Sequence, residues 1–299
     1  MDGIIIINKP KGYTSHDVVN KIRKIYNTKK VGHTGTLDPN ATGVLPILIG
    51  KATKLSQILV EHDKTYIATI KLGEKTNTAD SEGEVIEVRD TNVPQKEDVE
   101  KVLKTFLGTQ LQTPPIYSSI KIDGKKLYEY AREGKKVQIP KREITVYNIE
   151  LKNIVGLEIE FLVSCSKGTY IRSLCEDIAE KLGTIGYMKE LTRVQVDKFN
   201  IRDSYTLEEV EKNKDTIKII SIEEILRNNE KIILNKEKLN LFLNGGRINI
   251  KKIMNHENID RDIQDYTENN LIVRVYNEQN DFIGTGIINN NILKRDIVI

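Results

Sequence analysis

The chain has 299 residues, longer than one typical domain of about 100 to 200 residues, so we expect one large domain with a small appendage. Hydrophobic residues make up 38% and charged residues 30% of it, a composition that excludes a fibrous or disordered protein. The apolar run of residues 4–7 is too short and wrongly flanked for a signal peptide or a membrane span. We therefore predict a cytoplasmic protein that does not enter a membrane.

The net charge of +3 is unevenly spread along the chain. Residues 1–60 carry nine lysines and arginines against three aspartates, a net charge of +6, and residues 121–147 add eight basic groups against four acidic ones. A protein face that meets a polyphosphate shows such an asymmetry. Solvated lysine-rich faces give the same pattern, so both interpretations stay open at this point.

The first fifty residues predict a strand, a helix and a long loop. Residues 4–7 are a β-branched run that ends at a Lys-Pro-Lys-Gly turn, which indicates a buried strand. A helix with apolar residues at helical spacing should follow, capped by Ser15. Residues 31–50 lack periodicity and predict a loop rich in Gly, Thr, Pro and Asp. Loops of this length inside a compact domain tend to be functional.

The next 150 residues mix strands and helices. Strands are predicted for residues 65–72, 84–88, 144–151, 157–165 and 190–199. Helices are predicted for residues 54–60, 96–107 and 171–182, the last one stopped by Gly183. Because strands and helices do not alternate regularly, we expect an α+β fold with a mainly antiparallel or mixed sheet.

The end of the chain changes character. Short acidic helices at residues 207–212 and 222–228 indicate a connector. Two short strands, residues 271–276 and 283–288, and an asparagine turn at 289–291 then predict a small β module. We expect a large domain over residues 1–230 and this module over residues 231–299.

Several kinds of site are excluded by spacing. Gly50-Lys51 is followed by alanine and has no glycine five residues earlier, so it is not a P-loop, and no Gly-x-Gly-x-x-Gly follows a strand. The four histidines show no paired spacing. Cys165 and Cys175 fit neither a disulfide framework nor a zinc site and are predicted to be buried thiols. We expect no bound nucleotide and no metal.

Asp38 is the candidate that remains in the glycine-rich loop. Pro39 restricts the backbone of Asp38 to extended conformations, so a stiff loop presents the carboxylate. No serine or cysteine stands at a nucleophile elbow near His33 and Asp38, which disfavours acyl transfer. An ordinary Asp-Pro turn and a nucleophilic or acid/base aspartate aimed at a nucleic acid are both consistent with these residues.

Four segments resemble one enzyme family. Gly-His-Thr-Gly-Thr-Leu-Asp-Pro-Asn-Ala-Thr-Gly-Val-Leu, residues 32–45, resembles the catalytic motif of the TruB-type tRNA pseudouridine synthases. Residues 9–15, 64–66 and 167–174 resemble that family's N-terminal, tyrosine and late arginine motifs, in the family's order. The resemblance covers roughly residues 3 to 199. The tail resembles a PUA-type RNA-binding module through Gly245-Gly246 and Phe282-Ile283-Gly284.

This resemblance implies a fold and a reaction. The fold is the pseudouridine synthase fold, a central mainly antiparallel mixed sheet flanked by helices and loops, with a small PUA-like domain. The reaction is the isomerisation of uridine to pseudouridine at the T-arm position of tRNA conventionally called 55. It proceeds by flipping of the base, without cofactor or metal. The implied partner is the T-arm stem-loop of tRNA, with no obligatory protein partner and a monomer as the default.

The resemblance also implies catalytic roles for three residues. Asp38 is the nucleophile and attacks either the uracil ring or the ribose C1′; the sequence leaves both routes open. Arg172 pairs with Asp38, and a neighbouring guanidinium lowers a carboxylate pKa. Tyr66 stacks on the flipped uracil and places its hydroxyl near the sugar, where it can serve as a base. The alternatives are a surface arginine at a helix start and a core tyrosine in a strand.

Further residues are implied to bind the substrate. Tyr170 and Leu191 correspond to pocket positions, with a core role almost equally favoured. His33 acts where the target base leaves its stack, and Lys9 buttresses the site; an exposed loop histidine and lysine are the alternatives. Two departures from the family, Ala179 in the late helix and residues 192–198 without an arginine-rich, glycine-containing ending, concern the packing near Leu191.

The basic segment of residues 121–147 falls where the family places an RNA-contacting insertion. Its lysines, interleaved with Tyr128 and Tyr130, predict a thumb-like element that contacts phosphates through Lys125, Lys126, Lys135 and Lys136. Two rival functions stay open. One is a guide-RNA-dependent relative with the same Asp38 chemistry, and the other is an RNA-binding or tRNA-folding protein in which catalysis is secondary or absent.

Overall fold

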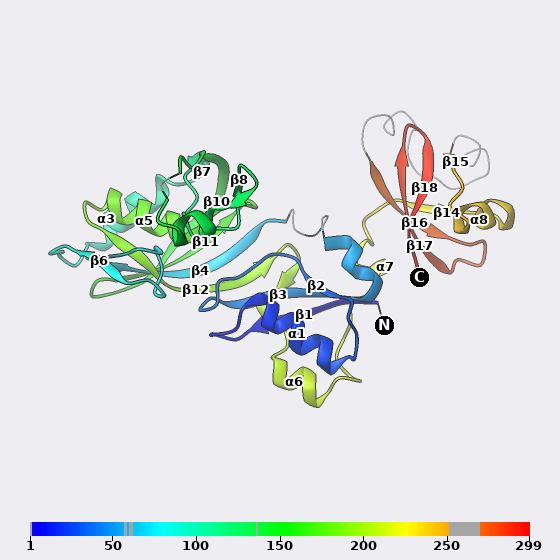
Figure 1. The fold of residues 1–299 in the computed structure, drawn as a ribbon, viewed down its shortest axis with the longest axis horizontal. Helices are drawn as coiled ribbons and strands as arrows, with labels where there is room; N and C mark the ends of the chain where they lie inside the picture. The colour runs from blue at the N-terminus through cyan, green and yellow to red at the C-terminus, as the bar shows by residue number, and fades with distance from the viewer. Residues whose placement is uncertain (1, 57–58, 60–61, 136, 251–269) are drawn as a thin grey trace.

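The structure is a computed structural model that describes residues 2–56, 59, 62–135, 137–250 and 270–299. It is organised around a nine-stranded sheet and a five-stranded sheet, which lie apart from each other in Figure 1. Helices interrupt the strands without regular alternation. The predicted α+β fold with a small C-terminal β module is therefore confirmed.

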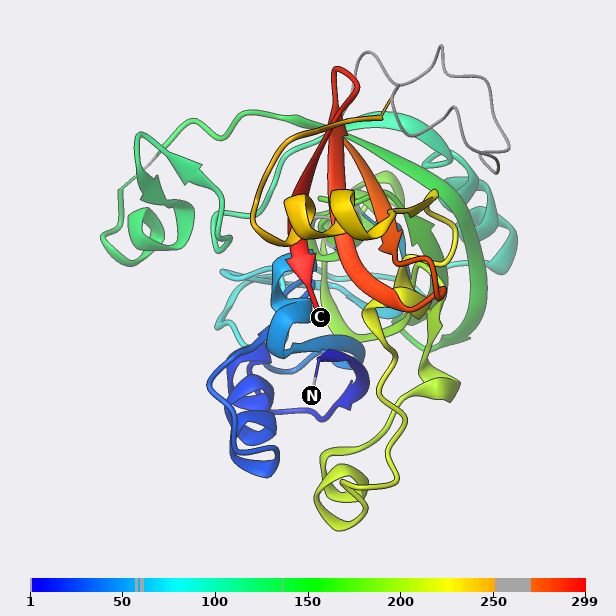
Figure 2. The same cartoon turned by 90° about the vertical axis from the view of Figure 1, so that its right-hand side faces the viewer.

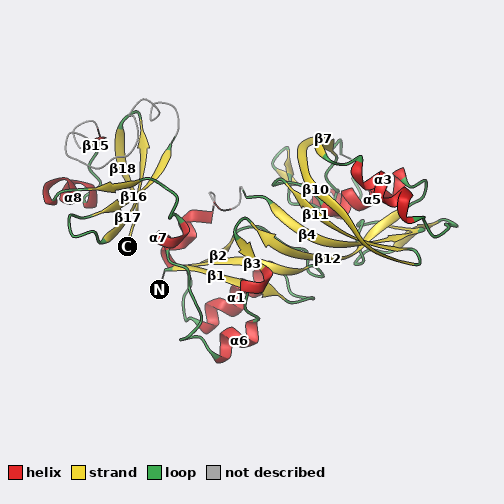
Figure 3. Cartoon of the chain, turned by 180° about the vertical axis from the view of Figure 1, so that it is seen from behind, coloured by secondary structure: helices red, strands yellow, loops and turns green. Residues whose placement is uncertain are grey.

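The large sheet forms the body of the molecule, as its yellow strands show in Figure 3. Its strand order is β1 (Gly3–Lys9), β3 (Thr42–Ile49), β12 (Gly186–Val196), β4 (Lys64–Leu72), β11 (Glu158–Cys165), β10 (Arg142–Val155) and β7 (Gly108–Gln112). β2 (Val31–His33) pairs with β3, and β13 (Phe199–Asn200) pairs with β12. Neighbouring strands are antiparallel except for the parallel pair of β3 and β12, so the prediction of a mainly antiparallel mixed sheet is confirmed.

The isoleucine run of β1 is buried on both faces of the sheet. Ile4 and Ile6 join one apolar cluster, whereas Ile5 and Ile7 join another cluster together with the apolar side of α1 (Ser15–Ile25). A strand covered on both faces needs no polar alternation, which explains its uninterrupted apolar sequence.

The start of α1 differs from the prediction. Thr14, not Ser15, is the N-cap: its hydroxyl accepts a hydrogen bond from the Asp17 N–H at 3.0 Å, and the Asp17 carboxylate accepts one from the Thr14 N–H at 2.9 Å. Ser15 is buried, and its hydroxyl accepts a hydrogen bond from the Leu37 N–H at 2.9 Å. Ser15 therefore ties the helix to the loop that carries Asp38.

The predicted loop of residues 31–50 was too long. β2 and β3 form its two ends, and residues 34–41 connect them. β3 is almost wholly buried, but Gly43 and Pro46 within it are typical of loops and disguised the strand in the sequence. Gly43 adopts a φ of 102°, and a Cβ placed there would lie 2.2 Å from the Arg193 carbonyl oxygen. Glycine thus permits the close approach of β3 to β12.

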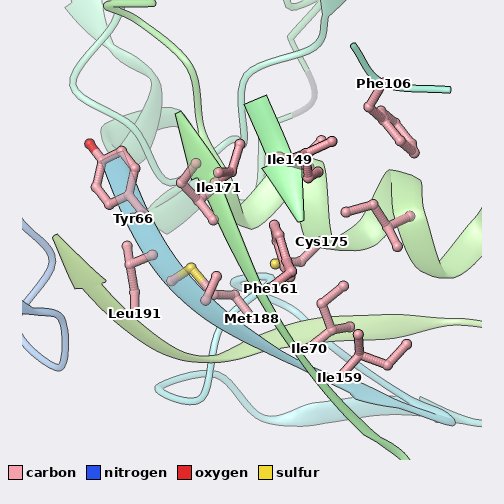
Figure 4. Close-up of a cluster of buried hydrophobic side chains, with 14 of the residues drawn as sticks. Tyr66, Ile70, Phe106, Ile149, Ile159, Phe161, Ile171, Cys175, Met188 and Leu191 are labelled. Carbon is pink, nitrogen blue, oxygen red and sulfur yellow. The ribbon is translucent and has the colours of Figure 1, made fainter. Parts of the chain in front are cut away.

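The second half of the large sheet packs against α5 (Ile171–Lys181) and α3 (Lys96–Lys104). Figure 4 shows this core, with Phe161, Ile70 and Cys175 at its centre and Tyr66 and Leu191 at one end. Both cysteines are buried free thiols, as predicted, and burial raises the pKa of Cys165 to about 11. The core therefore ends directly beside two of the predicted site residues.

Element types were predicted better than element ends. α5 and α6 (Leu207–Lys212) lie where the sequence places them, and Gly183 follows α5 with a φ of 81°. α3 ends three residues early, and β12 begins at Gly186, four residues before its predicted start. α7 (Ile222–Ile225) is shorter than predicted. Of the helix predicted at residues 54–60, the described start belongs to a 3₁₀ helix, η1 (Gly50–Leu55), and residues 57–58 and 60 lie outside the described residues.

The small sheet lies beyond the connector helices. Its strands are β14 (Lys231–Ile233), β15 (Ile248–Asn249), β16 (Leu271–Tyr276), β17 (Phe282–Asn289) and β18 (Ile292–Val298), with the helix α8 (Lys236–Leu243) between β14 and β15. The predicted asparagine turn is present, because Asn290 and Asn291 have positive φ between β17 and β18. None of the described helices is both long and apolar enough to cross a membrane.

The remaining short strands form two ribbons. β5 (Glu74–Thr76) pairs with β6 (Val85–Val88), and β8 (Lys121–Ile122) pairs with β9 (Lys125–Lys126). The second ribbon and the helix α4 (Leu127–Arg132) lie within the basic segment of residues 121–147 and project from the body in Figure 2. A short 3₁₀ helix, η2 (Ile201–Asp203), follows β13.

Candidate active site

A cavity of about 980 Å³ lies where the Asp38 loop, β4, β12 and the start of α5 meet. Six of the seven predicted site residues line this cleft: His33, Asp38, Tyr66, Tyr170, Arg172 and Leu191. They come from segments separated by more than a hundred residues, and the fold brings them together. Lys9 lies outside the cleft lining.

Asp38 and Arg172 form the ion pair that the resemblance implies. The Arg172 Nε lies 3.2 Å from Oδ2 of Asp38, and Nη2 lies 3.5 Å from Oδ1. The Arg172 side chain is 9% exposed, whereas that of Asp38 is 36% exposed toward the cleft. The carboxylate is thus held by a buried guanidinium from the first turn of α5 and stays accessible to a substrate.

The pKa of Asp38 differs in direction from the expectation. Burial raises this pKa, Arg172 and Lys9 lower it, and the nearby Asp80 raises it, so that the pKa lies above the ordinary aspartate value. The predicted effect of the guanidinium is present but is outweighed by the loss of water around the carboxylate. Arg172 therefore limits the rise.

Asp80 is a site residue that the sequence did not reveal. Its Oδ2 lies 3.4 Å from Nη1 of Arg172, and its side chain is only 9% exposed. Its Oδ1 accepts hydrogen bonds from the Thr78 hydroxyl at 2.6 Å and the Glu82 N–H at 3.0 Å. One guanidinium therefore joins two carboxylates, of which Asp80 is fixed by the protein and Asp38 faces the cleft.

Two main-chain carbonyls also accept hydrogen bonds from Arg172. Nη2 donates to the Tyr117 carbonyl at 2.9 Å and Nη1 to the Thr78 carbonyl at 3.4 Å. Tyr117 lies just before the basic insertion, so this insertion begins close to the arginine that holds Asp38. The guanidinium has a fixed fork of donors, and these partners leave it little freedom to rotate.

Tyr66 lies at the inner wall of the cleft. It is 8% exposed, and in Figure 4 its ring borders the apolar core while its oxygen points away from the cluster. Burial raises the pKa of Tyr66, and the nearby positive charge of Arg193 opposes that rise. The phenol thus combines an apolar ring face with a polar end beside a cation.

Leu191 and Tyr170 line the cleft from neighbouring elements. Leu191 pairs with Ala68 across β12 and β4 and is 8% exposed, so it belongs to the core and to the cleft wall at once. Tyr170 is the N-cap residue of α5, and the buried Gln112 accepts from its N–H at 2.8 Å and donates to its carbonyl at 3.0 Å. Gln112 thus fixes the backbone immediately before Arg172.

Lys9 supports the Asp38 loop through hydrogen bonds to main-chain carbonyls. It is fully buried, and its ammonium donates to the carbonyls of Tyr13, Pro39 and Pro10 at 2.5, 2.8 and 3.1 Å. Burial lowers the pKa of Lys9 to about 8, with Asp38 acting in the opposite direction. All three main-chain acceptors lie on or next to the segments that hold the Asp38 loop.

His33 and several cations lie around the cleft. The His33 Nδ1 accepts from the Gly35 N–H at 3.3 Å, and burial and Arg193 lower its pKa. Lys64, Arg142 and Lys167 also line the cleft. No group of three or more His, Cys, Asp or Glu side chains in the described ranges is placed to hold a metal ion. The cleft thus combines the Asp38 carboxylate and the Tyr66 phenol with surrounding positively charged side chains.

The fold identifies the class of protein. The chain matches a chain of a solved Cbf5-Nop10-Gar1 complex at a TM-score of 0.67 and 25% identity. The match covers 99% of this chain and 84% of that one. It also matches a chain of an H/ACA RNP bound to a substrate RNA containing 2′-deoxyuridine, at a TM-score of 0.65 and 26% identity, over 95% of this chain and 77% of that one. The fold is thus that of the Cbf5- and TruB-type pseudouridine synthases, as predicted.

Sequence relatives narrow the class to one family. Residues 23–171 match the TruB family pseudouridylate synthase N-terminal domain, and residues 172–233 match the tRNA pseudouridylate synthase B C-terminal domain. Proteins named tRNA pseudouridine synthase B are 44% identical in Clostridium kluyveri, over 96% of both chains, and 42% identical in Clostridioides difficile, over 96% of this chain and 94% of that one. The chain belongs to the TruB family of pseudouridylate synthases, which confirms the resemblance seen in its motifs.

Proposed function

We propose that the chain isomerises a uridine in the T-arm loop of tRNA, at the position conventionally called 55, to pseudouridine, with Asp38 as the nucleophile. The observation that carries this proposal is the accessible Asp38 carboxylate, held by Arg172 in a cleft beside Tyr66. Many curated relatives are named for tRNA, which supports tRNA as the substrate. We further propose that the protein is cytoplasmic, acts as a monomer and needs no other protein.

The cleft supplies what a flipped uridine needs. Leaving the stack costs a few kcal/mol, which stacking and hydrogen bonds in the pocket must offset. Tyr66 offers a ring face, and the walls formed by Leu191, Ile171 and Met188 exclude water from the base. Asp38 then attacks either C1′ of the ribose or the uracil ring, the N1–C1′ bond breaks, and the base rejoins through C5.

The ion-pair network suits a nucleophilic carboxylate. Arg172 stabilises the charged form of Asp38, and Asp80 and two carbonyls hold Arg172 in place. An RNA-binding protein without catalysis has no need of this arrangement. A guide-dependent relative does need it, so the distinction from the guide-dependent rival rests on activity without added RNA.

Mapping the product position tests this function. Unmodified tRNA transcript incubated with the purified chain alone is expected to gain one pseudouridine, in the T-arm loop, detected by carbodiimide labelling and primer extension. A transcript with cytidine at that position serves as the control. Modification elsewhere, or only after a guide RNA is added, would contradict the assignment.

We also propose that residues 1–230 are the catalytic domain and residues 231–299 a PUA-like RNA-binding domain. The five strands of the small sheet all lie after residue 230 and surround their own apolar cluster, which includes Phe242, Val273 and Leu293. A core of its own is what an independent module requires.

The basic insertion is expected to contact tRNA phosphates. Its Lys125 and Lys126 lie over the rings of Tyr130 and Tyr128 at 5.0 and 5.3 Å, and Glu133 pairs with Lys125 and Lys135. Replacing Lys125, Lys126 and Lys135 with glutamine should weaken tRNA binding and reduce the slope of log affinity against log salt by about 0.7 to 0.9 for each phosphate that is no longer neutralised. Lys136, the fourth lysine predicted to contact phosphate, lies outside the described residues.

A filter-binding titration over several salt concentrations measures this slope. The matched control replaces Lys96 and Lys101, exposed lysines of α3 paired with Glu100 and Asp98, and should leave the slope unchanged. A wild-type slope in the insertion variant would show that the insertion does not contact phosphate.

A further inference from the structure

Arg193 is the largest fully buried side chain that borders the cleft, and it takes no part in the Asp38 ion pair. It is 1% exposed and lies on β12. The strand register places Arg193 opposite Tyr66 of β4 on one side and opposite Gly43 of β3 on the other. The guanidinium therefore sits between the strand of the cleft tyrosine and the strand that follows the Asp38 loop.

The guanidinium of Arg193 has three neighbours. Nε donates to the Val44 carbonyl at 2.7 Å, and Nη2 donates to the Gly35 carbonyl at 3.1 Å. The third neighbour is the Tyr66 phenol, which lies opposite Arg193 in the strand register and lines the same cleft. Gly35 and Val44 lie before and after Asp38 in the sequence. One side chain thus contacts the backbone on both sides of the nucleophile and lies beside the tyrosine.

Among the residues that the structure describes, no carboxylate pairs with Arg193. The neighbouring group that can carry a negative charge is the Tyr66 phenol. Burying an unpaired cation is costly, and arginine cannot relieve the cost by losing its proton. The positive field therefore acts on neighbouring groups. It opposes the rise that burial causes in the pKa of Tyr66, and it adds to the lowering that burial causes in the pKa of His33 and Lys64.

We propose that Arg193 is a positioning residue that prepares the Tyr66 oxygen to take the proton that leaves C5 in the last step of isomerisation. This inference rests on the proposed function. A guanidinium beside the phenol oxygen favours the phenolate, and a hydrogen bond between the two becomes charge-assisted once the phenolate forms.

Atoms and electrons balance in this step. The Tyr66 phenol loses its own proton to solvent, with Arg193 compensating the charge. After the C1′–C5 bond has formed, the phenolate takes the hydrogen of C5 as a proton. The C–H electron pair restores the C5=C6 double bond, the electron pair of the C6=N1 double bond returns to N1, and N1 takes a proton from solvent.

A purely structural alternative is that Arg193 only clamps the Asp38 loop through Gly35 and Val44. The two roles differ in the step that fails. Loss of a clamp impairs the attack by Asp38, whereas loss of the positioning role slows the removal of the C5 proton. A deuterium label at C5 of the target uridine distinguishes these steps.

The experiment measures single-turnover pseudouridine formation on transcripts with protium or deuterium at C5. Arg193→Gln is expected to slow the reaction roughly 10- to 100-fold, which is within the range of one acid–base contribution. The isotope effect should be larger than in the wild type. Tyr66 replaced by 3,5-difluorotyrosine, whose phenol is more acidic, should restore much of the rate in the Arg193→Gln protein. Tyr66→Phe and the double variant should show similar rates, because both remove the same function.

Two further variants keep the proposal falsifiable. Arg142→Gln removes an exposed arginine of the cleft and should weaken tRNA binding without changing the isotope effect. If Arg193→Gln does not fold, Arg193→Lys keeps the charge with fewer donors and should show a smaller loss with a raised isotope effect. A slow Arg193 variant with a wild-type isotope effect and no gain from difluorotyrosine would overturn the positioning role. A wild-type protein that forms no pseudouridine would instead overturn the proposed function.

Discussion

Asp38→Asn is expected to lower the rate of pseudouridine formation at least about 1,000-fold, while the affinity for tRNA stays close to that of the wild type. Asparagine has nearly the same shape as aspartate but cannot form the covalent bond that the mechanism requires. The Asp38 side chain contributes its oxygens to Arg172 and to the cleft, and it forms no part of the apolar core. The fold and the phosphate contacts should therefore survive the change.

Single-turnover kinetics with saturating enzyme and a binding titration measure both quantities. Glu87→Gln is a suitable control, because Glu87 forms an exposed pair with Arg89 far along the chain from the loop. A rate in the Asp38→Asn protein within about tenfold of the wild type would exclude Asp38 as the nucleophile. A large loss of binding would instead assign Asp38 to substrate recognition.

Arg172→Met is expected to lower the rate roughly 100-fold and to move the acidic limb of its pH dependence to higher pH. Burial already raises the pKa of Asp38, and Arg172 counteracts that rise. Without the guanidinium the pKa rises further, so the active carboxylate is lost at a higher pH as the solution is acidified. Methionine fills a similar volume, which limits the change to the charge and the hydrogen bonds.

Asp80→Asn provides the contrasting variant. The charge of Asp80 raises the pKa of Asp38, so its removal should move the acidic limb to lower pH, although the rate falls because Arg172 loses an anchor. Opposite shifts in the two variants would support electrostatic control of Asp38. Acidic limbs that coincide with the wild type in both variants would show that Asp38 ionisation does not limit the reaction.

Breaking the buried Arg172–Asp80 pair should also lower the free energy of unfolding by about 3 to 5 kcal/mol, measured by denaturant unfolding.

Local sequence signals predicted most of the fold. The isoleucine run of β1, the helical spacing of α5 and its glycine stop each depend on neighbouring residues, and the structure contains all three. The strand β3 was missed because Gly43 and Pro46 stand within it and are typical of loops, unlike the uninterrupted isoleucine run of β1. Ser15 looked like a cap, yet its hydroxyl is used by the Asp38 loop, a contact that spans 22 residues of sequence.

The candidate site could be predicted only as far as its motifs reached. Asp38 and Arg172 stand in recognisable segments, and the structure brings them together. Asp80 lies in a polar stretch that reads as an ordinary turn, and only the fold shows that it meets Arg172. Arg193 lies in a strand with no signal of its own, and its partners come from β3, β4 and the Asp38 loop. Such long-range contacts have no local signature.

Tritium release from 5-tritiated uridine in an unmodified tRNA transcript tests the central claim most directly, because the C5 hydrogen must leave when the base rejoins through carbon. With the purified wild-type chain and no added protein or RNA, we predict release from the T-arm uridine, and none with Asp38→Asn at equal tRNA binding. Tight binding of tRNA by both proteins without any release of tritium would contradict the claim. That result would favour an RNA-binding or guide-dependent function.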